Sequence, residues 1–167
     1  ADVVGHWARE SIAQLIETGI VSGYPDGSFQ PDKTVTRAEF TVMLLKALKL
    51  EQKSGPVFKD TATHWAKDAI ASAAAYGLVK GYDQNNFGPD HLITREQAAV
   101  MIAGAAKLEA AQEVLEFTDA GQISAWAISG VAAAATGKIL TGYPDNSFRP
   151  QGKLTRAEAA AIIAKLL

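Results

Sequence analysis

Three tryptophans occur in the 167-residue chain, and the same residue types follow each of them at the same distances. Glycine and tyrosine come 16 and 17 residues later, phenylalanine 22, proline 24, and a Thr-Arg pair 29 and 30 residues later. Self-similarity of this kind indicates a repeat protein in which each copy is one supersecondary unit. We therefore expect one domain made of three copies, spanning residues 1–50, 51–108 and 109–167.

Each copy is predicted to fold as helix, loop, helix, which gives a mainly α-helical protein. The first helix follows the tryptophan, where apolar residues recur at one-face helical spacing, as at Ala8, Ile12 and Leu15. In copies two and three the side chains of this stripe are nearly all small. Small side chains let helices approach closely, so these two first helices are expected to lie near a central axis. The second helix is expected to begin at Thr-Arg-Ala-Glu or Thr-Arg-Glu-Gln, which has the form of a capping box. The loop between them, residues 23–29 in copy one, is rich in turn-forming residues.

Composition removes several classes of function. The net charge of −2 argues against a nucleic-acid partner or an anionic membrane, since both require an excess of basic residues. The chain has no cysteine, which excludes zinc–thiolate sites, disulfides and thiol nucleophiles. No apolar run approaches the roughly 18 residues of a membrane-spanning helix, so no membrane segment is expected.

No catalytic or metal motif is recognisable in the sequence. A nucleophile elbow, a phosphate-cradling loop and a His-Glu-x-x-His sequence are all missing. His6 and His64 precede tryptophans, but copy three has Ala125 there, so a threefold histidine cluster is not expected. These histidines are instead predicted to contact the start of a helix. We predict a protein that is not an enzyme and holds no metal or cofactor.

The arginines of the Thr-Arg pairs are the most informative candidates: Arg37, Arg95 and Arg156. Each is expected at the first position of a helix, where the dipole disfavours a cation by about 0.3–1 kcal/mol. A partner should therefore compensate this cost. One alternative is a structural salt bridge, for example to the loop aspartate of a neighbouring copy. The other, which we favour, is a guanidinium fork aimed at an anionic ligand, with the helix N-terminus attracting the same anion.

Other repeated residues allow two interpretations each. The tryptophans could be buried anchors of the first helix or flat platforms for a sugar. The glycines are expected to serve backbone conformation, or else to let a ligand approach the main chain. The loop aspartates either cap the turn, which we favour, or accept hydrogen bonds from sugar hydroxyls, whereas the phenylalanines are expected in the core. Beside the arginines, the candidate ligand-binding residues are Trp7, Trp65, Trp126, Gly23, Gly81, Gly142, Tyr24, Tyr82, Tyr143, Asp26 and Asp145.

With these motifs, the chain resembles the S-layer homology domain family over essentially its whole length. The resemblance rests on Phe-x-Asp before His-Trp-Ala (residues 58–66), Gly-Tyr-Pro-Asp-Gly-Ser-Phe-x-Pro (23–31) and Thr-Arg-Ala-Glu (36–39). It implies a pseudo-threefold spindle with a central helical bundle, secreted and located at the cell wall or S-layer of a Gram-positive-type bacterium. Such modules tether S-layer proteins or exoenzymes to a secondary cell wall polymer that bears pyruvylated N-acetylmannosamine. The resemblance also implies grooves between repeats, in which the motif arginine matters for binding.

Three further expectations follow. Stacked helical repeats commonly bind proteins, so a protein-interaction module is the alternative function; it predicts a broad concave apolar surface and no dependence on the arginines. The copies also differ, because copy three has two extra residues before Trp126 and Gln151 in place of Asp32 and Asp90. The three sites are therefore expected to bind unequally. Because three copies can complete the spindle by themselves, a monomer is expected.

Overall fold

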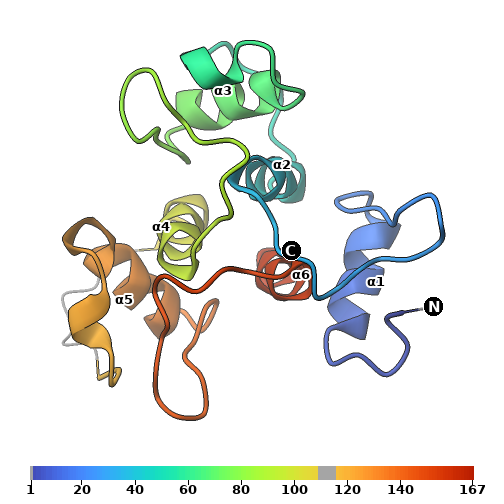
Figure 1. The fold of residues 1–167 in the computed structure, drawn as a ribbon, viewed down its shortest axis with the longest axis vertical. Coiled ribbons are helices and arrows are strands. Elements are labelled where there is room, and N and C mark those ends of the chain that lie inside the picture. Colours follow the sequence, from blue (N-terminus) through green and yellow to red (C-terminus); the bar gives the residue numbers. More distant parts are fainter. Residues whose placement is uncertain (1, 109–115) are drawn as a thin grey trace. The chain divides into compact units, whose positions relative to one another are not determined.

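A computed structural model describes residues 2–108 and 116–167, which are mainly helical (Figure 1). The α-helices of these residues are α1 (Arg9–Glu17), α2 (Arg37–Ala47), α3 (Lys67–Ala75), α4 (Arg95–Ala105), α5 (Ile128–Thr136) and α6 (Arg156–Ala164). Short 3-10 turns are η1 (Lys59–Thr61), η2 (Ala120–Gln122) and η3 (Ala125–Ala127). The described ranges contain isolated β-bridges but no strand, which confirms the predicted helical class. None of their helices is long and apolar enough to cross a bilayer.

The second helix of every copy begins where the capping box predicts. In α2 the Thr36 hydroxyl accepts a hydrogen bond from the Glu39 amide at 3.1 Å, and the Glu39 carboxylate accepts from the Thr36 amide at 3.0 Å. Thr94 with Gln97 and Thr155 with Glu158 repeat both bonds at α4 and α6. These reciprocal bonds satisfy amides that a helix start otherwise leaves without partners.

The chain divides into two compact units, residues 1–92 with 154–167, and residues 93–153. In the first unit α2 packs against α6, α1 packs against α6, and α3 packs against α2. In the second unit α5 packs against α4. The helix that covers the first helix of a copy therefore belongs to a different copy. The expectation that the first helix of copy two lies near a central axis is wrong in the first unit, where α2 and α6 pack together between α1 and α3.

Small residues bring neighbouring segments into close contact in each unit. A Cβ on Gly130 of α5 would lie 2.9 Å from the Cα of Val100 in α4, so these two helices approach more closely than a side chain would allow. In the first unit Gly55 lies directly against Ala71 of α3, and the Ser72 hydroxyl accepts a hydrogen bond from the Lys53 amide at 2.9 Å. Small residues of α3 and α5 thus allow close contact with neighbouring segments.

Candidate functional site

Arg37, the first residue of α2, binds the loop of the next copy through two backbone carbonyls. Its Nε donates to the Phe87 carbonyl and its Nη2 to the Lys80 carbonyl, both at 3.0 Å. The guanidinium carbon lies 4.8 Å from the ring centre of Tyr82 and 4.6 Å from that of Phe87. Only 5% of Arg37 is exposed. The partners that stabilise this cation at the helix start are therefore backbone carbonyls and aromatic rings.

The other two arginines repeat this arrangement. Arg95 donates to the carbonyls of Phe148 at 2.7 Å and Thr141 at 2.8 Å, and it lies over the Tyr143 ring. Arg156 donates to the carbonyls of Phe29 and Ser22, both at 2.9 Å, and lies over the Tyr24 ring. Copy one thus reaches copy two, copy two reaches copy three, and copy three reaches copy one. We name the three sites after their tyrosines: the Tyr24 site (with Arg156 and Phe29), the Tyr82 site (with Arg37 and Phe87) and the Tyr143 site (with Arg95 and Phe148).

The helix start beside each arginine offers no free amide. In α2 the Arg37 amide donates to the His91 carbonyl at 2.8 Å and the Ala38 amide to the Pro89 carbonyl at 3.0 Å, while the Glu39 amide belongs to the capping box. The same pattern recurs at α4 and α6. An anion therefore finds no free amide at this helix start, and the predicted attraction by the helix N-terminus can act only through its dipole, which stays a prediction.

The charges of Arg37 and Arg156 are not neutralised by a direct contact with a carboxylate. Neither forms an ion pair with any described residue, so the salt-bridge alternative is wrong for these two arginines. Burial lowers the pKa of Arg37, while Tyr82 and Asp60 act in the opposite direction. The described residues contain no buried side-chain nitrogen that lacks a partner, and the protein partners of both arginines are on Nε and Nη2. Nη1 of each is therefore not completely buried.

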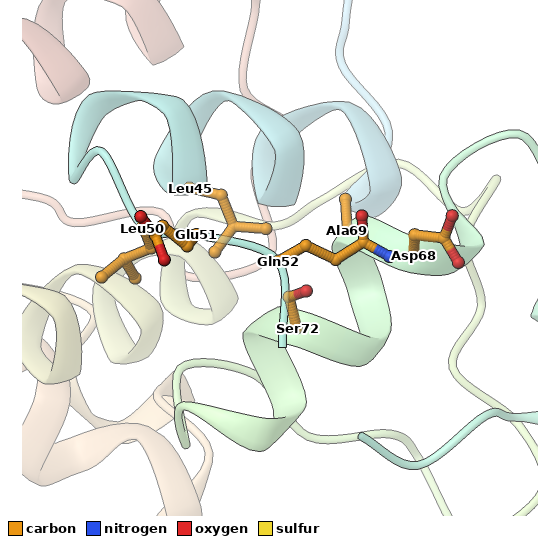
Figure 2. A pocket seen from close by; sticks show the side chains of 7 residues that line it. All are labelled: Leu45, Leu50, Glu51, Gln52, Asp68, Ala69 and Ser72. Carbon is orange, nitrogen blue, oxygen red and sulfur yellow. The ribbon is translucent and has the colours of Figure 1, made fainter. Parts of the chain in front are cut away.

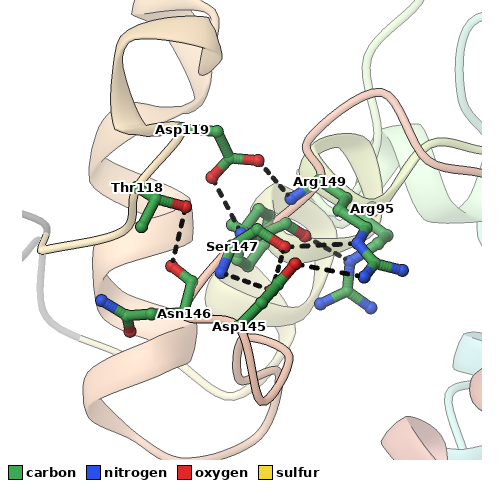
Figure 3. Close-up of polar contacts among 8 residues, drawn as sticks. Arg95, Thr118, Asp119, Asp145, Asn146, Ser147 and Arg149 are labelled. Atoms are coloured by element: carbon green, nitrogen blue, oxygen red, sulfur yellow. Dashed lines mark hydrogen bonds and ion pairs between the residues drawn. The ribbon is translucent and has the colours of Figure 1, made fainter.

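The loop aspartates hold the turns, as predicted. Asp26 Oδ1 accepts from the Ser28 amide at 2.9 Å and the Ser28 hydroxyl at 2.6 Å, and Asp145 repeats both bonds with Ser147 (Figure 3). The hydroxyl and amide of Ser28 lower the pKa of Asp26, and those of Ser147 do the same for Asp145. Both carboxylates are committed to the turn, which confirms that interpretation.

A second set of aspartates, to which the sequence reasoning gave no role, orders the same loops. Asp119 accepts from the amides of Phe148 and Arg149, both at 2.8 Å (Figure 3), and Asp2 and Asp60 make the corresponding bonds in their own copies. Desolvation raises the pKa of Asp119, but the two amides outweigh it and the pKa is lowered. The Phe-x-Asp motif was the sequence feature that could have indicated this role. These carboxylates position the phenylalanine whose carbonyl receives the arginine.

The repeated glycines make room for the loop rather than for an unusual backbone. Gly23, Gly81 and Gly142 all lack a positive φ, so the predicted conformational role is wrong. A Cβ on Gly142 would lie 2.6 Å from the Phe117 ring and 2.8 Å from the Ser147 carbonyl. Gly81 is crowded in the same way by Phe58 and by loop carbonyls, whereas the nearest atom at Gly23 is the Ser28 carbonyl at 3.0 Å.

The tryptophans are not buried anchors. Trp7, Trp65 and Trp126 are 68%, 67% and 60% exposed, whereas Phe29, Phe87 and Phe148 are buried as predicted. His64 lies beside Trp65, with ring centres 5.3 Å apart, and its Nδ1 accepts from the Ala66 amide at 3.0 Å at the start of α3. His6 makes the same contact before α1, which confirms the predicted helix-start role of both histidines. The platform interpretation of the tryptophans stays a prediction.

One shallow hollow in the first unit lies apart from these residues (Figure 2). It is open to one side and combines apolar with polar and acidic lining. The residues around it come from the end of α2, the following connector and α3: Leu45, Leu50, Glu51, Gln52, Asp68, Ala69 and Ser72. It contains none of the predicted ligand-binding residues.

Fold and sites together define a helical repeat protein in which an arginine from one copy is seated on the aromatic loop of another. Residues 1–41, 57–99 and 116–160 each match the model of the S-layer homology domain. The chain therefore belongs to the S-layer homology domain family, with three tandem copies.

Similar segments occur in surface proteins and in much longer enzymes. The chain is 39% identical to an amylopullulanase of Thermoanaerobacterium thermosulfurigenes over 99% of its length, which is 9% of that enzyme. It is 30% identical to a surface-layer 125 kDa protein of Lysinibacillus sphaericus over 98% of its length and 14% of that protein. A cellulosome-anchoring protein of Acetivibrio thermocellus is 38% identical over 76% of the chain and 30% of that protein. Family and relatives confirm the predicted location at the cell wall or S-layer of a Gram-positive-type bacterium.

Proposed function

We propose that this chain is a non-catalytic anchoring module that binds an anionic secondary cell wall polymer through its three arginine–tyrosine sites. Family membership supports surface anchoring. The relatives support it as well, because the chain matches surface-layer proteins and an anchoring protein as well as enzymes. It spans less than a third of each of these proteins, and we propose that it tethers a surface-layer protein or an exoenzyme.

The observation that carries the proposal is the charge of Arg37. The guanidinium is almost fully buried and satisfied in part by carbonyls, which carry no formal charge; Asp60 attracts it electrostatically but forms no ion pair with it. A buried charge without a counter-charge is costly, and a ligand carboxylate that supplies the counter-charge removes part of that cost. The carbonyls occupy Nε and Nη2, so the carboxylate approaches the Nη1 end. A pyruvate ketal presents one carboxylate of this kind.

Aromatic residues supply the rest of a sugar-binding surface. Tyr82 lies over Arg37 and stays 53% exposed, and Trp65 in the same copy is 67% exposed. Exposed rings offer flat apolar faces with a polar edge, which suit the apolar face of a pyranose. We therefore propose that the carboxylate is bound by the arginine and the sugar ring by tyrosine and tryptophan.

The test is calorimetric titration of the chain with three forms of one synthetic sugar. These are pyruvylated N-acetylmannosamine, its pyruvate methyl ester and the same sugar without pyruvate. The proposal expects binding of the free acid and at least tenfold weaker binding of the other two, since a hydrogen bond to a charged group contributes about 1.5–3 kcal/mol. Equal binding of all three would refute the arginine–carboxylate mechanism. No binding of any form would refute this ligand and favour a protein partner.

Two arginine variants sharpen the test. Arg37→Gln removes the charge but keeps a donor for a loop carbonyl, so the fold has a substitute contact. Arg9→Gln is the matched control, because Arg9 also occupies the first position of a helix yet is exposed. We expect weaker binding for Arg37→Gln alone, with circular dichroism spectra of both variants unchanged. Equal affinities for the two variants would contradict the proposal.

A further inference from the structure

A second basic residue contacts the tyrosine of each site, and it comes from the tyrosine's own copy. In the Tyr24 site Lys33 Nζ donates to the Tyr24 hydroxyl at 3.2 Å and lies 5.0 Å from the ring centre. In the Tyr82 site the same sequence position is His91, whose Nδ1 lies 3.2 Å from the Tyr82 hydroxyl. Each of these tyrosines therefore contacts two basic side chains, one of them the arginine from another copy.

The Tyr143 site obtains its second basic residue from a different position. Gly152 stands where the other copies have lysine or histidine. Arg149 replaces that contact from the other end of the loop, with its guanidinium carbon 3.7 Å from the Tyr143 ring centre. Its Nη2 also lies 3.5 Å from Asp145 (Figure 3), which partly neutralises its charge. The arrangement is kept in all three copies, while the chemical group that completes it differs.

The three groups respond differently to pH. Lysine and arginine stay charged over the physiological range, whereas histidine as a residue type gains its charge between about pH 5 and pH 8. The groups that face His91 are the Tyr82 hydroxyl and Arg37, which lies over the Tyr82 ring and donates its amide to the His91 carbonyl. The neighbouring Asp90 binds His64 at 2.8 Å. No described carboxylate contacts His91, so a bound anion would be its negative partner.

We propose that Lys33, His91 and Arg149 determine the specificity of the three sites, and that His91 makes the Tyr82 site bind acidic saccharides more tightly at mildly acidic pH. The inference rests on the proposed function, because it needs a carboxylate at the site. When the carboxylate binds near neutral pH, His91 takes up one proton from solvent and places a second positive charge beside the tyrosine. The Tyr24 and Tyr143 sites, with permanent charges, keep their affinity over the same range.

Nuclear magnetic resonance of the full chain can separate the sites. The backbone amides of Tyr24, Tyr82 and Tyr143 serve as reporters in titrations with pyruvylated N-acetylmannosamine at about pH 5.5 and about pH 7.5. We expect the affinity at Tyr82 to fall roughly two- to fivefold at the higher pH, which is the scale of an exposed ion pair. His91→Lys should abolish that fall, and Lys33→His should introduce one at Tyr24.

The outcomes distinguish this inference from the proposed function. Binding at the sites with no greater pH dependence at Tyr82 than at Tyr24 would overturn the inference and leave the function standing. A pH dependence that survives in His91→Lys would also overturn it, and would assign the effect to the His64–Asp90 pair. No response of any reporter at either pH would overturn the proposed function, and the inference with it. Both substitutions exchange residues that copies one and two already carry at this position, so the fold should tolerate them.

Discussion

Replacing Arg37 by alanine should destabilise the folded chain even without a ligand. The substitution removes two hydrogen bonds of a charged donor, each 3.0 Å long and each worth about 1.5–3 kcal/mol. It also removes contacts with the rings of Tyr82 and Phe87, which add about 0.5–1 kcal/mol. Relief from burying an unpaired charge, which costs several kcal/mol, offsets part of this loss. We expect a net decrease of about 2–4 kcal/mol in the free energy of unfolding.

Arg156→Ala is the matched control, because it removes the same two kinds of hydrogen bond at a more solvent-exposed position. Arg156 is half-buried and its bond to the Ser22 carbonyl is exposed, so water can replace it and the loss should be about 1–2 kcal/mol. Urea unfolding followed by both circular dichroism and tryptophan fluorescence measures the two variants, and coincident curves justify a two-state treatment. A loss below about 0.5 kcal/mol for Arg37→Ala, or a larger loss for Arg156→Ala, would refute the reasoning.

Two further predictions concern the loops. Gly81→Ala should destabilise the chain by about 1–3 kcal/mol, because its Cβ would lie 2.7 Å from the Asp83 carbonyl. Gly104→Ala in α4 is the control: its Cβ meets no atom within 4 Å, so it should stabilise the chain by about 0.5–1 kcal/mol. Thermal unfolding of both variants measures the difference, and equal effects would contradict the prediction. The pKa values of the loop aspartates are lowered in the folded state, so their contribution to stability should be full above about pH 4 and should decline as the pH falls through their folded-state pKa values. Asp119→Asn should therefore lose less stability than the wild type over that range. Urea midpoints from about pH 7 to about pH 2.5 test this, and the same loss of stability in variant and wild type would count against it.

The features that the sequence predicted correctly depend on local chemistry. A capping box needs only a threonine and a Glu or Gln three residues later, so the starts of α2, α4 and α6 follow from four-residue motifs. The turn role of Asp26 and Asp145 is equally local, because each bonds a residue two positions away. Burial of the repeated phenylalanines follows from residue type and period.

The partners of the arginines could not be predicted, because a backbone carbonyl has no sequence signature. Every residue carries one, so the question which carbonyls meet Arg37 is answered only by the packing of one copy on another. The same limit explains the error about helix packing, since an apolar stripe shows which face is covered but not which helix covers it. The exposure of the tryptophans agrees with one of the two alternatives that the sequence left open. The general preference of tryptophan for burial favours a core position, but a repeated position can equally belong to a functional surface.

The residues at which copies two and three depart from the repeated pattern lie in contact with one another in the second unit. Copies one and two link the tryptophan segment to the loop by a histidine–aspartate pair, such as His64–Asp90, but copy three has Ala125 and Gln151 there. Glu96, which stands where the other copies have alanine, accepts from the Ser124 amide and hydroxyl at 2.9 and 2.6 Å and from Gln151 at 3.3 Å.

This carboxylate is 4% exposed and comes from the preceding copy, so it replaces a link within one copy by a link between two. The unusual Thr-Arg-Glu-Gln sequence and the altered tryptophan segment are therefore in direct contact through Glu96. The Tyr143 site differs from the other two in how its loop is held as well as in its second basic residue. If the three sites bind unequally, as the sequence predicts, these two differences are structural reasons for it.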